Sequence, residues 1–192
     1  DFWLVYLNEC VPTDEICNSL DDNCNGLIDD GITVEISIAA DGPTTICQGN
    51  TVVFTATHTG STLQWKKNGV NIPGATASTY TTGIKGTYSC VASSDCDADT
   101  SANIVVVVNK NPSASISAGG PTSFCAGGSV SLTEIPSGGG TYQWYKGAAP
   151  IAGATGLSYV ATTAGNYKCR VTKAATGCFK NSNSIAVFIT CK

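Results

Sequence analysis

The sequence predicts an all-β protein with two tandem β-sandwiches. A small head precedes them and is expected to be stabilised by disulfides and a bound cation. Three observations lead to this prediction. The 192 residues are rich in Gly, Ser, Thr and Val and contain no long run of helix-forming residues. A pattern of short strands occurs twice. An acidic, cysteine-containing segment precedes both copies.

The two copies are recognised by matching segments. TTICQGNTVVFTA in the first copy corresponds to TSFCAGGSVSLTE in the second, and GTYSCVA corresponds to GNYKCRV. Trp65 and Trp144 set the period of the repeat at 79 residues. We therefore expect a head over residues 1–31, a first domain over residues 32–110 and a second domain over residues 111–192.

Each copy alternates β-rich runs with turn residues, as in TVVFTAT, STLQWKK and ANIVVVV, which predicts about seven short strands per copy. Trp65 fits the buried tryptophan of strand C in an immunoglobulin-like sandwich. Tyr88, two residues before Cys90, fits the tyrosine corner of strand F. Trp144 and Tyr167 repeat both features in the second copy.

These copies resemble the immunoglobulin-like repeats of bacterial surface and secreted proteins, and of long adhesins in particular. The resemblance covers about residues 32 to 192 and implies a location outside the cell, secreted or on a bacterial surface. It implies no particular activity, because this type of sandwich carries many different functions.

Ten cysteines in a chain of this length indicate an oxidising, extracellular compartment. A zinc site is not expected, because the sequence has no CxxC spacing and His58 is the only histidine.

The starts of strands B and F lie close together in such a sandwich, because the two strands run in the same direction. This proximity favours the disulfides Cys47–Cys90 and Cys125–Cys169. The sequence leaves an alternative open, in which the partners are the F–G loop cysteines Cys96 and Cys178.

The segment EICNSLDDNCNGLIDDG has the side-chain spacing of a calcium-binding loop. Asp21, Asn23 and Asn25 alternate, so a tight loop can point their oxygens toward one hard cation. Gly26 permits the sharp turn that brings a backbone carbonyl, that of Leu27, into the coordination shell.

The twelfth position of this loop is Ile32 rather than Glu, so the loop is no EF-hand, and we expect Asp29 or Asp30 to complete the shell. Without a cation these carboxylates would repel one another. A Cys17–Cys24 disulfide is expected to keep the loop compact. The simpler alternative is an acidic, solvated turn.

The segment also resembles the MopE-type metal-binding motif, in which Glu-x-Cys precedes an Asp/Asn-rich loop and a final acidic pair. The resemblance covers about residues 10 to 31. Some members of that family are linked with copper, but hard oxygens with no nearby histidine favour calcium here. The matching residues are Glu15, Cys17, Asp21, Asp22, Asn23, Cys24, Asn25, Gly26, Asp29 and Asp30. Glu15 is therefore counted with the expected cation ligands of the loop.

A second acidic stretch, SDCDADT, is either another cation site or an ordinary solvated loop. Catalysis is not expected. His58 lies in a turn-like segment without a nucleophile beside it, and the usual catalytic motifs are absent. We therefore predict that the chain is not an enzyme.

Charge is distributed unevenly along the chain. No Lys or Arg precedes Lys66, whereas Glu134 is the only acidic residue from Asn111 onward. This modest basic region, in a chain with an isoelectric point of about 4.8, does not indicate nucleic-acid binding. No apolar run reaches the roughly 18 residues that a membrane span needs.

The stretch DFWLVYL is apolar on both faces if it forms a strand, so Phe2–Leu7 is expected either to pack on the head or to add a strand to another copy. The prediction is a subunit of a bacterial surface filament or stalk that assembles head to tail. Calcium and disulfides would stabilise it. In this hypothesis Cys10 pairs with Cys96 across a domain junction, and Cys178 or Cys191 reaches a neighbouring subunit.

The alternative prediction is an adhesin, or a fragment of a larger secreted protein that binds surface glycans. Tyr142 and Tyr145 are its candidate stacking residues, because Trp65 and Trp144 are expected in the cores.

Overall fold

The structure, a computed structural model, describes residues 13–135 and 140–190. The segment Phe2–Leu7 and the cysteines Cys10 and Cys191 lie outside the described residues. The chain divides into two compact units, one of Asp1–Ile46 with Asn50–Val107 and one of Cys47–Gly49 with Val108–Lys192. The head groups with the first unit.

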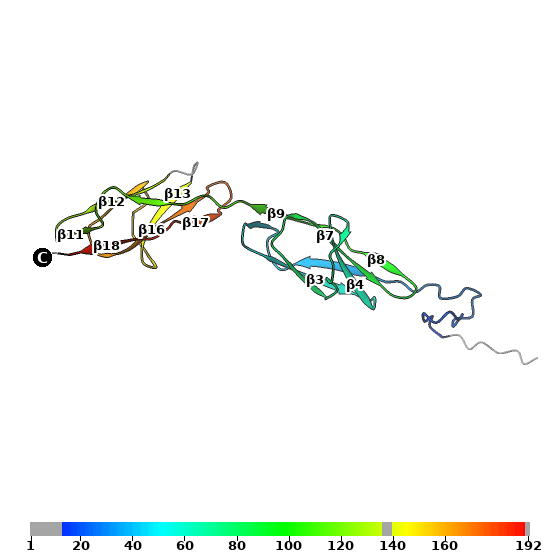
Figure 1. The fold of residues 1–192 in the computed structure, drawn as a ribbon. Coiled ribbons are helices and arrows are strands. Elements are labelled where there is room, and N and C mark those ends of the chain that lie inside the picture. The colour runs from blue at the N-terminus through cyan, green and yellow to red at the C-terminus, as the bar shows by residue number, and fades with distance from the viewer. Residues whose placement is uncertain (1–12, 136–139, 191–192) are drawn as a thin grey trace, which may run out of the picture. The chain divides into compact units, whose positions relative to one another are not determined.

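The first unit contains an immunoglobulin-like β-sandwich, without helix in its described residues (Figure 1). One sheet has the strand order β1-β3-β6, and the other has the order β2-β9-β7-β4-β5, with β8 pairing to β7. The strands are β1 (Ile36–Ala40), β2 (Thr45–Cys47), β3 (Val52–His58), β4 (Thr62–Lys67), β5 (Val70–Asn71), β6 (Thr79–Thr82), β7 (Gly86–Ser93), β8 (Ala98–Thr100) and β9 (Ile104–Asn109).

The second unit repeats this arrangement with the strand orders β10-β12-β15 and β11-β18-β16-β13-β14, and β17 pairs with β16. Its strands are β10 (Ile116–Ala118), β11 (Ser123–Phe124), β12 (Val130–Glu134), β13 (Thr141–Lys146), β14 (Ala149–Pro150), β15 (Ser158–Ala161), β16 (Gly165–Thr172), β17 (Phe179–Asn181) and β18 (Ile185–Ile189). The predicted fold class, tandem immunoglobulin-like sandwiches, is confirmed.

An aromatic cluster fills each core, because alternate residues of a strand point to the same face. Trp65 is fully buried and stacks on Phe54 and Tyr80, with ring centroids 5.9 and 5.7 Å away. Trp144 is likewise fully buried and lies against Tyr159. The prediction that both tryptophans belong to the cores is confirmed.

Both predicted tyrosine corners are present. The Tyr88 hydroxyl donates to the Ile84 carbonyl at 2.8 Å, and the Tyr167 hydroxyl donates to the Thr163 carbonyl at 2.8 Å. Each bond runs four residues back along the chain, and it satisfies a phenol whose ring is fully buried.

The predicted disulfides within the sandwiches are wrong. Cys47 is bonded to Cys178 of the second copy, and Cys90 and Cys169 are buried thiols. Cys47 ends β2, which lies on the same sheet as β7 but two strands away from it. Strands about 4.8 Å apart place it roughly 10 Å from β7, beyond disulfide reach. Cys125 follows β11, which is likewise two strands from β16.

The cysteines near the head also pair differently from the prediction. Cys17 is bonded to Cys96, with 5.9 Å between the Cα atoms, so neither a Cys17–Cys24 nor a Cys10–Cys96 disulfide forms. Cys24 is disulfide-bonded as well. Because Cys178 is also bonded, it is not available to a neighbouring subunit. These disulfides are typical of proteins in an oxidising compartment.

Within the described residues, no helix is both long and apolar enough to cross a membrane.

Candidate functional site

The described head, residues 13–31, contains neither helix nor strand, and its carboxylates hold the loop together. Asp29 accepts hydrogen bonds from the backbone N–H groups of Asn18 and Ser19 at 2.9–3.1 Å. Glu15 accepts from the backbone N–H of Asn23 at 3.1 Å and from that of Asp29 at 2.8 Å. These bonds supply the backbone pairing that regular structure would otherwise provide.

The other predicted ligands form a second group in the same loop. Asp21 accepts from the backbone N–H groups of Asn25 and Gly26 at 3.1 and 2.8 Å. Asp30 accepts from the side-chain amides of Asn23 and Asn25 at 3.1–3.3 Å. Gly26 has a φ of +91°, which is the turn that the sequence predicted from this glycine.

The loop brings Asp21, Asn23, Asn25 and Asp30 into one hydrogen-bonded group. Glu15 and Asp29 form another, which the bond from the Asn23 N–H to Glu15 links to the first. The Leu27 N–H bonds to the Asn25 side-chain oxygen at 2.8 Å, and the Leu27 side chain is exposed.

The carboxylates of the two groups do not converge on one point. Among the described residues, the one set of three acidic, cysteine or histidine side chains with ligand atoms within 4.8 Å is Cys17, Asp29 and Cys96. Its two sulfurs form a disulfide and supply no thiolate.

The second acidic stretch has a structural role in the first sandwich. Asp97 accepts a hydrogen bond from the Val34 N–H at 2.7 Å, and Asp99 accepts from the Ile36 N–H at 3.3 Å. The two carboxylates therefore cover backbone donors where the chain enters β1, and they link β1 to β8. With the Cys17–Cys96 disulfide beside them, they anchor the head to the first sandwich.

We expect the Cys17→Ser/Cys96→Ser variant to release the head while leaving the first sandwich folded. The free energy of opening of head peptides should fall by about 2–4 kcal/mol, the usual effect of losing a disulfide. Hydrogen exchange measured by mass spectrometry tests this. Cys90→Ala, which removes a buried thiol but no disulfide, is the control. Unchanged protection of residues 13–31 would contradict the anchoring role.

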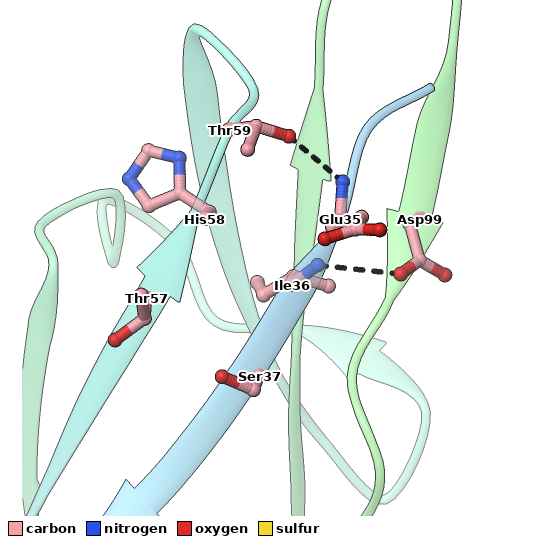
Figure 2. Close-up of a pocket in the computed structure, with 7 residues that line it drawn as sticks. All are labelled: Glu35, Ile36, Ser37, Thr57, His58, Thr59 and Asp99. Atoms are coloured by element: carbon pink, nitrogen blue, oxygen red, sulfur yellow. Dashed lines mark hydrogen bonds between the residues drawn. The ribbon is translucent and has the colours of Figure 1, made fainter.

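A groove of about 380 Å³ lies beside this junction, and Glu35 and Asp99 are the acidic residues that line it (Figure 2). Figure 2 shows the two hydrogen bonds that order one wall: the Glu35 N–H donates to the Thr59 hydroxyl oxygen, and the Ile36 N–H donates to the Asp99 carboxylate. The lining residues are Glu35, Ile36, Ser37, Thr57, His58, Thr59 and Asp99.

His58 is not arranged for acid–base catalysis. It is the last residue of β3 and is half-buried, rather than part of an exposed turn as the sequence suggested. Its Nδ1 lies 2.7 Å from the Gly60 carbonyl, so this nitrogen carries the proton. Among the described residues, no carboxylate is hydrogen-bonded to the ring.

The second core contains a buried carboxyl group, that of Glu134, which no pattern in the sequence predicted. Glu134 is 0% exposed, and neither of its oxygens has a hydrogen-bond partner among the described residues. Burial raises the pKa of this carboxyl group, and the nearby Ser115 backbone lowers it by less. The pKa of the Cys169 thiol is raised to about 11, chiefly by burial, with a smaller contribution from Glu134.

No protein-family profile matches the chain, and no curated protein matches its sequence. Solved structures similar to it include murine CEACAM1b, with 15% identity, a TM-score of 0.37, and coverage of 81% of this chain and 100% of that one. Three N-terminal domains of the Highly Immunogenic Outer Capsid protein of bacteriophage RB49 show 16% identity and a TM-score of 0.39, over 82% and 59% of the two chains.

The ligand-binding domain of human OSCAR is similar at 16% identity and a TM-score of 0.35, over 79% of this chain and 97% of that one. Because the TM-scores are below 0.5 and the identities are low, these similarities say nothing about the partners or the activity of the chain.

Proposed function

We propose that the chain is a structural subunit of an extracellular filament or stalk, on a bacterial surface, in which the first unit of one copy contacts the second unit of the next. The observation that carries this proposal is the division of charge between the units. Residues 1–107 have 13 acidic and three basic side chains, a formal net charge of −10. Residues 108–192 have seven basic and one acidic side chain, a formal net charge of +6.

Opposite charge on two unlike surfaces favours contact between copies in one orientation and opposes contact between like units. A contact between unlike surfaces continues as an open fibre unless it closes into a ring. The accessible charged side chains of the second unit are all positive, because its single acidic side chain, that of Glu134, is buried in the core. Strand addition by Phe2–Leu7 is a further contact within the proposal.

Calcium in the head is part of the same proposal. The oxygens of Asp21, Asn23, Asn25 and Asp30 would hold the ion. Glu15, Asp29 and the Leu27 carbonyl are the further proposed ligands, and they would reach the ion by closure of the loop around it, since the carboxylates of the two groups lie apart in this structure. This oxygen-only donor set suits a hard cation. A carboxylate oxygen that accepts one backbone hydrogen bond keeps a second lone pair for a metal. The Oδ2 atom of Asp22 is also buried without a partner among the described residues.

The geometry favours this function over glycan binding through stacked aromatic rings. Trp65 and Trp144 are fully buried, and Tyr142 packs against the second core. Tyr145 has two cationic side chains over its ring. The two tyrosines that the sequence offered for sugar stacking are therefore packed against the core or covered by cationic side chains.

Light scattering of the chain in Ca²⁺, and again after chelation, tests the proposed function. We expect large particles in Ca²⁺ that shorten or dissociate after chelation, because unshielded carboxylates would loosen the head. Polymers that are indifferent to chelation would remove calcium from the proposal and leave assembly in place. A monomer of 19.6 kDa under both conditions would overturn the filament proposal.

The role of the head ligands is tested separately by titrating Ca²⁺ into the Asp21→Asn/Asp30→Asn variant. Binding should weaken at least about tenfold, since each substitution removes a charged ligand. Asp41→Asn, which neutralises an exposed acid outside the head, is the matched control and should bind Ca²⁺ as the wild type does.

A further inference from the structure

One face of the six-stranded sheet of the second unit carries an ordered row of cationic and aromatic side chains. The guanidinium of Arg170 on β16 lies 4.4 Å from the ring centroid of Phe179 on β17 and 5.0 Å from that of Tyr145 on β13. The ammonium of Lys168 lies 5.8 Å from the same Tyr145 ring. We call these four residues, Tyr145, Lys168, Arg170 and Phe179, the cationic face.

The row follows from the register of the sheet. Lys168 is paired with Tyr145, and Arg170 is two residues further along β16, so both point to the face opposite the buried Cys169. The Arg170 Nε also donates to the Asn181 side-chain oxygen at 3.3 Å. Ring contacts and this hydrogen bond hold the guanidinium in one orientation, which is the condition for paired hydrogen bonds to a carboxylate.

Among the described residues of the second unit, no acidic side chain lies against these cations. Glu134 is the only acidic residue after Asp99, and it is buried in the core. Phe179 is 49% exposed, so the face combines positive charge with an accessible aromatic ring. Its chemistry suits a partner that is both acidic and apolar.

The head has this combination of properties. Its described residues include no Lys or Arg, and Asp14 is an exposed acid that makes no hydrogen bond among the described residues. Every large apolar side chain of residues 13–31 is more than half exposed. These side chains are Ile16 at 59%, Leu20 at 61%, Leu27 at 59% and Ile28 at 63%. Such exposure in a small segment is typical of a contact surface.

We infer that the cationic face of one copy binds the head of a second copy. The Asp14 carboxylate, which is not among the proposed calcium ligands, would lie on Arg170 and Lys168, and head apolar side chains would lie against Phe179. This inference rests on the proposed function, and it names the two surfaces of the repeating contact. Because the Cys17–Cys96 disulfide anchors the head to the first sandwich, a head bound to the cationic face would fix the first sandwich of its own copy against the second unit of the neighbouring copy.

The test combines sedimentation velocity of the full chain with carbodiimide cross-linking, which joins a carboxylate to a lysine only when they are in contact. We expect cross-links between Lys168 and residues 13–31 in peptides from separate copies, shown by mixing ¹⁵N-labelled and unlabelled chains. Lys168→Glu/Arg170→Glu should weaken self-association at least about tenfold, which corresponds to about 1.4 kcal/mol. Lys110→Glu/Lys173→Glu makes the same charge change outside the face and is the control.

Exchanging the charges of one acidic and one basic residue between copies distinguishes a direct contact between them from a general effect of lost positive charge. Asp14→Arg alone and Arg170→Asp alone should each weaken association, and an equal mixture of the two variants should recover part of it. Recovery in the mixture requires contact between copies, because neither chain carries both substitutions.

The possible outcomes distinguish this inference from the filament proposal. Polymers whose cross-links lie elsewhere, or that survive the Lys168/Arg170 reversal, would overturn the inference and leave the filament. Closed dimers with the expected cross-links would support the inference and overturn the filament. Cross-links confined to single chains, or no self-association, would overturn the inference.

Discussion

Replacing Glu134 by Leu is expected to stabilise the second unit at pH 7 by about 1–3 kcal/mol, the cost of a buried polar group without a partner. The side chain lies on the core face of β12, where Val130 and Leu132 precede it at alternate positions. Leucine of similar length would restore an apolar interior. Glu134→Gln removes only the ionisation, so it separates the effect of charge from that of polarity.

The same group makes the stability of the second unit depend on pH. Below the ordinary glutamate value of 4.5, the carboxyl group is protonated in both the folded and the unfolded chain and adds no pH dependence. As pH rises above 4.5, the unfolded chain ionises first, because burial raises the pKa in the folded state. Stability is therefore expected to fall from about 4.5 up to the raised folded pKa, and then to level off.

Titration of the nearby Cys169 thiol does not alter this expected pH dependence. Cys169 on β16 has a pKa of about 11, so it remains a neutral thiol across the relevant range. Hydrogen exchange of the whole chain at pH 5 and pH 8, corrected for intrinsic rates, measures the effect in peptides from β12 and β16. Peptides from β3 and β7 serve as an internal control. Equal protection of the second unit at both pH values in the wild type would contradict the prediction.

Truncating Trp65 to Ala is expected to destabilise the first unit by about 3–5 kcal/mol, as is usual for a buried aromatic side chain. The indole is 0% exposed and stacks on two rings, and its Nε1 donates to the Ala77 carbonyl at 2.8 Å. The substitution therefore leaves a cavity and an unpaired carbonyl together. Trp65→Phe should lose less, because the ring contacts with Phe54 remain.

The effect of Trp65→Ala is measured by urea unfolding, with peptides from β4 and β7 followed by hydrogen exchange. Val105→Ala is the control, because Val105 is 56% exposed and its truncation should change stability little. A loss below 1 kcal/mol for Trp65→Ala would mean that the indole does not organise the core.

Local pattern in the sequence was sufficient to predict the sandwiches and their main core residues. Trp65 and Trp144 occupy the same position in the strand pattern of the two copies, and each corner tyrosine stands two residues before a cysteine. These residues could therefore be assigned to the cores from nearby sequence and from the repeat. The disulfides did not follow from local pattern. Cys47 was expected at the start of strand B, but it belongs to β2, which lies in the sheet of β7 and not in the sheet of β3.

The sequence by itself determined the all-β class, the core tryptophans and corner tyrosines, the acidic turn around Gly26 and the opposite charge of the two parts of the chain. Only the tertiary structure decided that Cys17 meets Cys96, that Asp97 and Asp99 hold β1, and that Lys168, Arg170, Tyr145 and Phe179 form one face. The physical reason is that strand order across a sheet brings distant residues together. Periodicity along the chain records which face a residue occupies but not which strand lies beside it.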